Sequence, residues 1–435
     1  MKKLLICVLL LSVCCSLFCS CNNTPSQPNI PPDNENNDNS QEITNDSPAI
    51  WDGSIASSFQ GGDGTESNPY QISSPSQLAY LAQQINSGAN YKGKYFSLTR
   101  DIDLNNIEWT PIGNGNFSFQ GDFNGNGHTI KNLKITNASK FSQFDTIIEK
   151  DMVWGVAGLF GICQNAAIYD IDLTEVNISV DTTDEYNDLF IGSLIGRVLS
   201  TSTFEINNIT VDEANISTDD SKSSTDVSGT TAIYAGGMIG YVKNDTAAIC
   251  NMTNIQNTAS VICKEKYTSE NTIGGIVGTI ANYNKFECRN FISYLTTESP
   301  SFPMGEFYCG AFGLISNRNV SVNLSNGFSK VSINNKTQDV SGEVAKHKWN
   351  SIIGCANQVK QQNGTVSGSY NFENLFGYVE VTRDTAVESK YSLYYLSDIA
   401  VFTENNCQAC ITLPQGNNLD SSVWNLDNLS APKLK

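Results

Sequence analysis

The stretch Gly155-Val-Ala-Gly-Leu-Phe-Gly161 decides the fold of this 435-residue chain, because its pattern recurs. Each copy places an apolar pair between glycines. The further copies are Ile191-Gly-Ser-Leu-Ile-Gly196, Ala235-Gly-Gly-Met-Ile-Gly240, Ile273-Gly-Gly-Ile-Val-Gly278 and the weaker Cys309-Gly-Ala-Phe-Gly313 and Ile352-Ile-Gly-Cys355. From 161 to 313 the closing glycines are 35, 44, 38 and 35 residues apart. A unit of this length cannot bury its apolar face alone, so the recurrence predicts stacked repeats.

Each copy is followed by further β-rich segments with turn residues between them. The second segments are Ala167-Ile-Tyr-Asp-Ile-Asp-Leu173, Phe204-Glu-Ile-Asn-Asn-Ile-Thr-Val211, Ala248-Ile-Cys-Asn-Met-Thr-Asn-Ile255 and Phe286-Glu-Cys-Arg-Asn-Phe-Ile292. A third run follows, as in Val176-Asn-Ile-Ser-Val180 and Ala259-Ser-Val-Ile-Cys263. Several short strands per repeat without a helical period predict an all-β protein, a parallel β-helix.

The composition suits an exported, elongated protein. Only 16% of the residues are charged and the net charge is −18, so the polar surface consists mainly of Asn, Ser and Thr. Stacked coils favour such residues, because like charges on neighbouring strands would lie about 4.8 Å apart. The acidic balance argues against nucleic acid or an anionic membrane surface as a partner.

The N-terminus predicts export and lipidation. Met1-Lys2-Lys3 precedes an apolar run from Leu4 to Phe18, which is too short for a comfortable transmembrane helix and has the flanks of a secretory signal. The following Phe18-Cys19-Ser20-Cys21 resembles the lipobox of bacterial lipoproteins, in which the lipidated cysteine follows a small residue. This resemblance implies lipid attachment at Cys21; it departs from the usual pattern at Phe18 and Cys19.

A tether and a single helix follow. Residues 22–48 are rich in Pro, Asn, Asp, Gln and Ser with almost no apolar content, which predicts a disordered tether. Ser74 is then a predicted N-cap, with Pro75 at the first helical position and Gln77 completing a capping box. The apolar face of this helix is Leu78, Leu81, Ala82 and Ile85, and Gly88 ends it. We expect the helix to cover the N-terminal end of the β-helix core.

A series of motifs between Trp51 and about residue 315 resembles the GLUG-repeat surface proteins of bacteria. The motifs are Gly62-Asp-Gly-Thr65, Asn68-Pro-Tyr70, Tyr95-Phe96, Asp101-Ile-Asp-Leu104, Trp109-Thr-Pro-Ile-Gly113, Gly121-Asp-Phe-Asn-Gly-Asn-Gly-His-Thr-Ile130 and Ala157-Gly-Leu-Phe-Gly161. The resemblance implies a right-handed, pectin-lyase-like β-helix in an adhesin-like lipoprotein of the Bacteroidetes type. The same repeat accompanies some immunoglobulin-A-cleaving metallopeptidases. These motifs belong to the scaffold and say little about activity.

The predicted organisation has five parts. Residues 1–20 form the lipoprotein signal peptide and 21–48 the tether. Residues 49–150 form the N-terminal cap and first coils, and 151–385 the GLUG-type repeats. Residues 386–435 form the C-terminal coil and cap.

Residues typical of catalysis are scarce. The chain has two histidines, His128 in the Asn-Gly-Asn-Gly-His turn and His347 in a Lys-His-Lys-Trp segment, and no His-Glu-x-x-His helix. It therefore lacks the zinc ligands of the peptidases that share the repeat. No Gly-x-Ser-x-Gly elbow, phosphate loop or dinucleotide fingerprint occurs. We expect no cofactor and no metal site.

Paired acids are the remaining catalytic candidates. They are Asp101 with Asp103, Asp170 with Asp172, Asp212 with Glu213, and Asp219 with Asp220. Acids two residues apart on a strand share a face and could bind calcium or act as a catalytic pair. The favoured interpretation is a solvated outer strand face.

Cysteines and aromatic residues complete the candidates. Aligning the second segments puts Ile206, Cys250 and Cys288 at matching positions, which predicts inward-facing thiols, unlinked rather than bridged. The Cys407-Gln-Ala-Cys410 pair is read as a loop bridge or two free thiols rather than as a redox or metal pair. The densest aromatic cluster, a weak candidate for stacking on sugar rings, is Tyr391, Tyr394 and Tyr395.

We therefore expect a non-catalytic, monomeric protein of the outer membrane, lipid-anchored and facing the cell surface or the periplasm. It would present a rigid β-helix for adhesion or for binding glycans or host surface proteins. The alternative is a polysaccharide lyase or glycoside hydrolase of the pectin-lyase-like fold, which would need a tight acid cluster on one face. A structural spacer would show neither a groove nor an aromatic patch.

Overall fold

The computed structural model divides the chain into two units, Met1–Thr44 and Asn45–Lys435. All described residues lie in the second unit. They are residues 47–145, 150–182, 186–219, 231–244, 248–263, 268–281, 285–298, 306–316, 321–334, 347–349, 351–357, 370–383, 386–392, 424–425 and 433–434.

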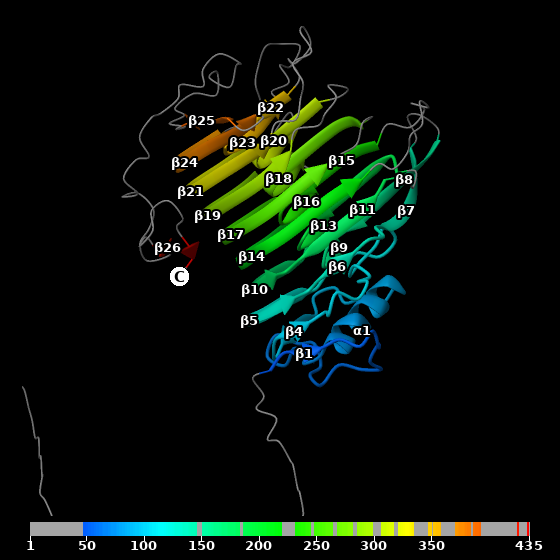
Figure 1. Ribbon diagram of the computed structural model, residues 1–435. Helices are drawn as coiled ribbons and strands as arrows, with labels where there is room; N and C mark the ends of the chain where they lie inside the picture. The colour runs from blue at the N-terminus through cyan, green and yellow to red at the C-terminus, as the bar shows by residue number, and fades with distance from the viewer. Residues whose placement is uncertain are drawn as a thin grey trace, which may run out of the picture. The chain divides into compact units, whose positions relative to one another are not determined.

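The described residues confirm an all-β protein: they hold one helix, α1 (Pro75–Asn86), and strands in two large sheets and one small one (Figure 1). The first sheet contains β1 (Ala49–Ile50), β2 (Tyr70–Ile72), β3 (Tyr95–Leu98), β4 (Ile102–Asp103), β5 (Asp122–Lys131), β6 (Lys134–Ile135), β10 (Ala167–Thr174), β11 (Asn177–Asp181), β14 (Thr203–Asp219), β17 (Ile249–Cys263), β19 (Lys285–Glu298), β21 (Ser321–Asn334), β24 (Tyr370–Arg383) and β25 (Ala386–Ser392).

The second sheet contains β7 (Ser139–Asp145), β8 (Lys150–Ala157), β9 (Phe160–Cys163), β12 (Asp188–Gly192), β13 (Ile195–Ser200), β15 (Thr231–Gly236), β16 (Ile239–Asn244), β18 (Thr268–Ala281), β20 (Glu306–Ser316), β22 (His347–Trp349) and β23 (Ile353–Asn357). The third pairs β26 (Trp424–Asn425) with β27 (Lys433–Leu434) in antiparallel orientation. These two strands therefore form a sheet of their own.

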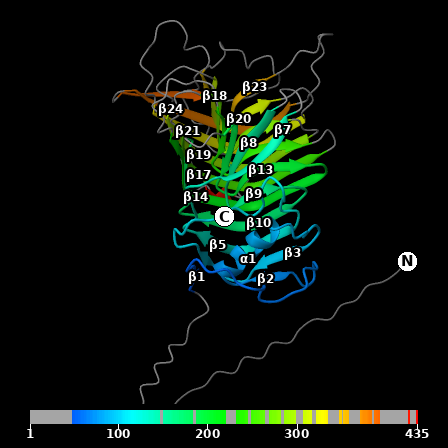
Figure 2. The same ribbon diagram turned by 90° about the vertical axis from the view of Figure 1, so that its right-hand side faces the viewer.

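Neighbouring strands in the two large sheets are parallel and come from successive repeats. In the first sheet the order β10-β14-β17-β19-β21-β24 follows the chain (Figures 1 and 2). The strands of the second sheet come between these in sequence, so the chain alternates between the two sheets. The antiparallel exceptions within the large sheets are β7 with β8 and β24 with β25.

The recurring glycines of the sequence form a column in the second sheet. A methyl group on Gly278 would lie 2.5 Å from the carbonyl oxygen of Gly240 and 2.7 Å from that of Ala235. The closing glycines at 196, 240, 278, 313 and 354 each lie in this way against the carbonyl oxygen of the preceding one. The glycines recur because each corner of the backbone leaves no room for a side chain.

We predict that Gly278→Ala lowers the free energy of unfolding by about 2–4 kcal/mol, because the methyl group meets backbone atoms that cannot rotate away. Urea denaturation measures this. Gly61→Ala is the matched control, since its nearest atom would be the Oε1 of Gln71 at 3.6 Å. Equal stability of the two variants would contradict the packing explanation.

A second column, of asparagine side chains, crosses the first sheet. Asn208 donates to Asp170 at 2.7 Å, Asn254 to Asn208 at 2.7 Å, and Asn290 to Asn254 at 2.9 Å. Asn326 continues the column at 3.2 Å from Asn290. All five residues have φ between 53° and 57°. Asn and Asp tolerate this left-handed region, so one residue type both bends each strand and links it to its neighbour.

We predict a graded loss of stability at Asn254. Asn254→Gly keeps the left-handed backbone but removes two hydrogen bonds, which costs about 1–3 kcal/mol. Asn254→Ala adds the left-handed penalty of about 1–2 kcal/mol. Urea titrations of both variants measure the difference, with the exposed Asn215→Ala as control. An alanine variant as stable as the glycine variant would show that the backbone conformation carries no cost.

The helix confirms most of its sequence signals. Ser74 is the N-cap, and its Oγ accepts a hydrogen bond from the backbone N–H of Gln77. The reciprocal contact differs from the prediction: Gln77 Oε1 accepts from the backbone N–H of Ser73, one residue before the cap. The helix ends at Asn86, and Gly88 follows with φ 95°. Figures 1 and 2 place α1 at the end of the stack formed by β1 to β4.

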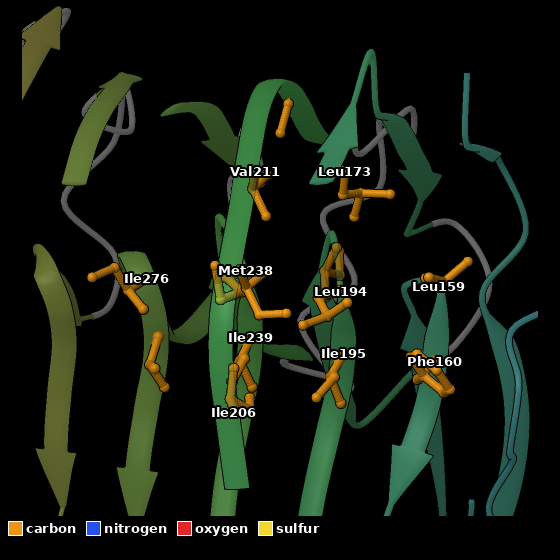
Figure 3. Packing of buried hydrophobic residues seen from close by; sticks show 14 of the residues in the cluster. Leu159, Phe160, Leu173, Leu194, Ile195, Ile206, Val211, Met238, Ile239 and Ile276 are labelled. Carbon is orange, nitrogen blue, oxygen red and sulfur yellow. The ribbon is translucent and has the colours of Figure 1, made fainter. Parts of the chain in front are cut away.

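The interior between the strands is apolar. The predicted helix face, Leu78, Leu81, Ala82 and Ile85, is buried in the same cluster as the repeat residues. Figure 3 shows inward side chains of this cluster, among them Ile206 and Val211 of β14, Ile239 of β16 and Met238, which lies between β15 and β16. Burying such a side chain contributes about 1.5–3 kcal/mol, so this core is the main stabilising term.

The cysteine alignment was wrong by two residues. Cys250 pairs with Phe204 and Phe286, whereas Cys288 pairs with Met252, the true counterpart of Ile206. Both thiols are nevertheless buried and unlinked, as predicted. Burial raises the pKa of each, so both remain protonated core residues.

Candidate functional site

A second cluster of side chains lies apart from the main core, on the opposite face of the second sheet. Its members are Trp154 of β8, Phe190 of β12, Arg197 of β13, Tyr234 of β15 and Tyr241 of β16. Their sequence neighbours on the same strands, such as Leu189, Ile191 and Val198, face the main core. Since successive strand residues point to opposite faces, each strand supplies both the core and this cluster. We call these five residues the aromatic–arginine cluster.

The strand register brings the cluster together. Phe190 pairs with Tyr234, and Arg197 pairs with Tyr241. Trp154 pairs with Asp188, which places that carboxylate beside the cluster. Phe190 lies before the corner at Gly192–Gly196 and Arg197 lies after it, so the geometry of this glycine corner sets the separation of the two side chains. The site therefore depends on the packing of two successive repeats.

Aromatic rings surround the arginine. The Arg197 Cζ lies 4.5 Å from the ring centroid of Trp154, 4.7 Å from that of Phe190 and 5.7 Å from that of Tyr241. Phe190 and Tyr234 are stacked, with centroids 5.3 Å apart and planes 12° from parallel. Such distances allow cation–π attraction, which desolvation strengthens.

The arginine is buried without a polar partner. Only 5% of Arg197 is exposed, and its Nε has no hydrogen-bond partner among the described residues. The Nε1 of Trp154 is a second buried donor without an acceptor in that part of the chain. Burial lowers the pKa of Arg197, although a guanidinium in a protein remains charged. Unpaired buried donors are uncommon and mark a position where an acceptor would be stabilised.

The neighbouring carboxylate does not neutralise this charge. Burial raises the pKa of Asp188 to about 6, and the opposing attraction of Arg197 and Lys243 is smaller. Among the described residues, Asp188 forms no ion pair within 4.0 Å. At neutral pH the cluster therefore contains a carboxylate and a guanidinium that are close but not bonded.

The predicted acid pairs have structural partners instead of a shared site. Asp101 lies 3.1 Å from His128 Nδ1 and accepts the backbone N–H of Thr129. Asp103 is 8% exposed, so the solvated-face interpretation is wrong for it; it accepts hydrogen bonds from Asn105 and Asn132.

The other acid pairs are also separated. Asp170 is the left-handed first member of the asparagine column, so it does not share a strand face with Asp172 as predicted. Glu213 has φ 53°, next to the half-buried Asp212. Asp219 ends β14 and Asp220 lies outside the described residues. No group of three or more His, Cys, Asp or Glu that could hold a metal occurs among the described residues.

The remaining candidates of the sequence cannot be placed in a site. Cys21, Tyr394, Tyr395, Cys407 and Cys410 lie outside the described residues. Tyr391 belongs to β25 and His347 to β22, but their side chains are not described. Within the part of the chain that is described, no helix is long and apolar enough to cross a membrane.

The aromatic–arginine cluster was missed because its residues are interleaved with core positions. A signal existed in the second repeat, where Arg197 interrupts the apolar run Ile195-Gly-Arg-Val-Leu199. A charged residue in such an apolar run indicates that its side chain points away from the main core, toward a surface that is itself partly apolar. Its aromatic neighbours, 7 to 44 residues away in the chain, could be assigned only from the strand register.

Comparisons with known proteins find two sequence relatives over part of the chain and a solved structure with a similar fold. No family model matches the chain. A protein provisionally named Gly-rich membrane protein, from Evansella cellulosilytica, is 28% identical over 164 residues, which are 36% of this chain and 16% of that protein. Halomucin from Haloquadratum walsbyi is 30% identical over 171 residues, 37% of this chain and 2% of halomucin. The chain thus spans a small part of the length of either relative.

A crystal structure at 1.30 Å of a candidate immunoglobulin A1 protease from Bacteroides ovatus is similar in fold. Its TM-score is 0.52 with 17% identity, covering 87% of this chain and 95% of that one. At this identity the likeness concerns the fold alone.

We predict that Asp188→Asn stabilises the protein at pH 7.5 by up to about 2 kcal/mol, because it removes a buried charge whose pKa is raised to about 6. A raised carboxyl pKa means that the folded state binds the proton more tightly than the unfolded state. Wild-type stability therefore falls as the pH rises from about 4 to 6. Thermal denaturation at pH 4 and pH 7.5 measures this, and an advantage of the variant that is equal at both pH values would contradict it.

Proposed function

We propose that the two large sheets are walls of one right-handed parallel β-helix of the GLUG-repeat type. Parallel pairing between successive repeats supports this, as does the alternation of the chain between the sheets. The glycine and asparagine columns support it further, because side chains stack on identical neighbours only when coils repeat in register.

We further propose that this β-helix is a non-catalytic glycan-binding protein of the bacterial cell envelope. The observation that carries the proposal is the aromatic–arginine cluster. Trp154, Tyr234 and Tyr241 are half-buried, so their outer parts remain available to a ligand. Aromatic rings that combine an apolar face with a polar N–H or O–H suit the mixed apolar and hydroxylated surface of a sugar.

The proposed location is the outer membrane, with Cys21 as the lipid anchor and residues 22–48 as the tether. The signal sequence and lipobox support it. The name of the Evansella relative refers to a membrane protein, and this agrees with an envelope location without defining the leaflet. Protease treatment of intact cells distinguishes surface from periplasmic exposure: loss of the fragment from Trp51 onward indicates the surface.

The enzymatic alternative is a polysaccharide lyase or hydrolase. Asp122 and Asp172 favour it, since burial raises the pKa of both and a general acid needs such a shift. Asp122, however, already interacts with Tyr95 and the backbone of Ala167, and Asp172 with Thr210. Release of shorter oligosaccharides from a bound polymer would favour this alternative over binding alone.

We predict that Trp154→Ala and Tyr241→Ala each weaken glycan binding about 10-fold, the equivalent of roughly 1.4 kcal/mol per lost ring contact. A glycan array identifies ligands and isothermal titration measures the affinity. Tyr169→Ala is the control, because Tyr169 is an outward aromatic residue of the first sheet. Wild-type affinity in both cluster variants, or equal loss in all three, would contradict the assigned site.

A further inference from the structure

Among the described residues, no carboxylate forms an ion pair with the Arg197 guanidinium of the aromatic–arginine cluster. A buried guanidinium ordinarily pairs with a carboxylate, because removing it from water costs several kcal/mol. In the part of the chain that the structure describes, no hydrogen bond or ion pair to the Arg197 side chain is found, and ring faces are its close contacts. Rings reduce the cost of burial but leave the buried Nε donor without an acceptor among these described residues.

The unpaired donors are clustered. Arg197 Nε and Trp154 Nε1 belong to side chains in direct contact, with the Arg197 Cζ 4.5 Å from the indole centroid. A single planar acceptor group with two oxygen atoms matches such donors better than a hydroxyl, because an arginine fork binds a carboxylate through two parallel hydrogen bonds.

The remaining charged groups at the site favour an anion locally. Asp188 faces Arg197 and Lys243, and Arg197 also faces Tyr234 and Tyr241. Among the described groups, the site thus has cations on β13 and β16 and one carboxylate on β12, within a chain of net charge −18. Two cations against one carboxylate favour an anion at this position, although the chain as a whole is acidic.

We propose that the ligand of the cluster is a carboxylate-bearing sugar, whose carboxylate binds the Arg197 guanidinium while its ring lies against the surrounding aromatic side chains. This inference rests on the glycan-binding function proposed above and specifies its ligand. Asp188 then competes with the ligand for Arg197: the ionised Asp188 carboxylate weakens the positive potential at the guanidinium and repels the carboxylate of the ligand. Protonation of Asp188 removes the competition.

The direction of the pH effect follows. The Asp188 pKa is about 6, whereas a sugar carboxylate titrates near about 3.5. Lowering the pH from 7.5 to 5 therefore neutralises Asp188 while the ligand stays charged. Binding of an acidic sugar should strengthen over this interval, and binding of a neutral sugar should not change.

The test is isothermal titration of the full-length protein with sialyllactose, a glucuronate-containing disaccharide, lactose and a sulfated disaccharide, at pH 5 and pH 7.5. We expect one or both carboxylate sugars to bind at least about 10-fold more tightly than lactose, and about 5-fold more tightly at pH 5 than at pH 7.5. Which of the two binds identifies the source of the carboxylate. The sulfated sugar should bind more weakly than the carboxylate sugar.

Two variants complete the experiment. Asp188→Asn should raise the affinity for the acidic sugar about 5-fold at pH 7.5 and abolish its pH dependence. Arg197→Gln should remove the preference for the acid; its circular dichroism spectrum and melting temperature establish that it folds. Asp188→Asn keeps the test decisive if Arg197→Gln does not fold.

The possible failures are distinguishable. Equal binding of acidic and neutral sugars, with no response to Asp188→Asn, overturns this inference but leaves glycan binding intact. A sulfated sugar that binds as tightly as the carboxylate sugars also overturns it. Binding of no sugar at either pH, on the array or in titration, overturns the proposed function itself.

Discussion

The close approach of backbone to backbone at the glycine column is the constraint on which the rest of the structure depends. Gly240 and Gly278 lie so near the carbonyl oxygens of the preceding repeat that no side chain fits between them. The hydrogen bonds of the parallel ladder set the spacing of successive strands in the second sheet, and the absence of side chains at these glycines lets the corners keep that spacing. The spacing in turn aligns the apolar residues on either side of each corner with their counterparts one repeat away, so that one continuous core forms.

The asparagine column solves a related problem in the first sheet. A residue such as Asn254 must adopt a left-handed backbone conformation so that the strand can bend. Its side chain must also hydrogen-bond to the same residue type in the preceding and the following repeat. Charged residues would repel one another at this distance, whereas an amide can both donate and accept. Asp170 can begin the column because its side chain only accepts a hydrogen bond, from Asn208, and an ionised carboxylate can accept one. The low content of charged residues is thus a consequence of repetition.

The candidate site lies on the face of the second sheet that is opposite to the main core. Phe190 and Arg197 alternate with buried aliphatic residues, so a strand of the scaffold also carries the aromatic–arginine cluster. Rigid strands hold ring faces and the guanidinium in fixed positions, which lowers the entropy cost of binding. The same rigidity keeps Asp188 half-buried beside Arg197 without a direct bond, and this arrangement makes its protonation sensitive to a pH near 6.

The sequence alone determined the repeat, the β-rich class, the helix from its N-cap at Ser74 to Gly88 and the inward position of Cys250 and Cys288, because local spacing and alternation encode these features. It could not determine the pairing register, and the two-residue error for Cys250 shows why: inward positions recur every second residue, so a shift by two keeps each side chain on the correct face and leaves the alternation unchanged. Only the tertiary structure decided that Trp154, Arg197 and Tyr241, from three different strands, meet on one face. Their contact depends on strand pairing between repeats, and no property of any single segment specifies it.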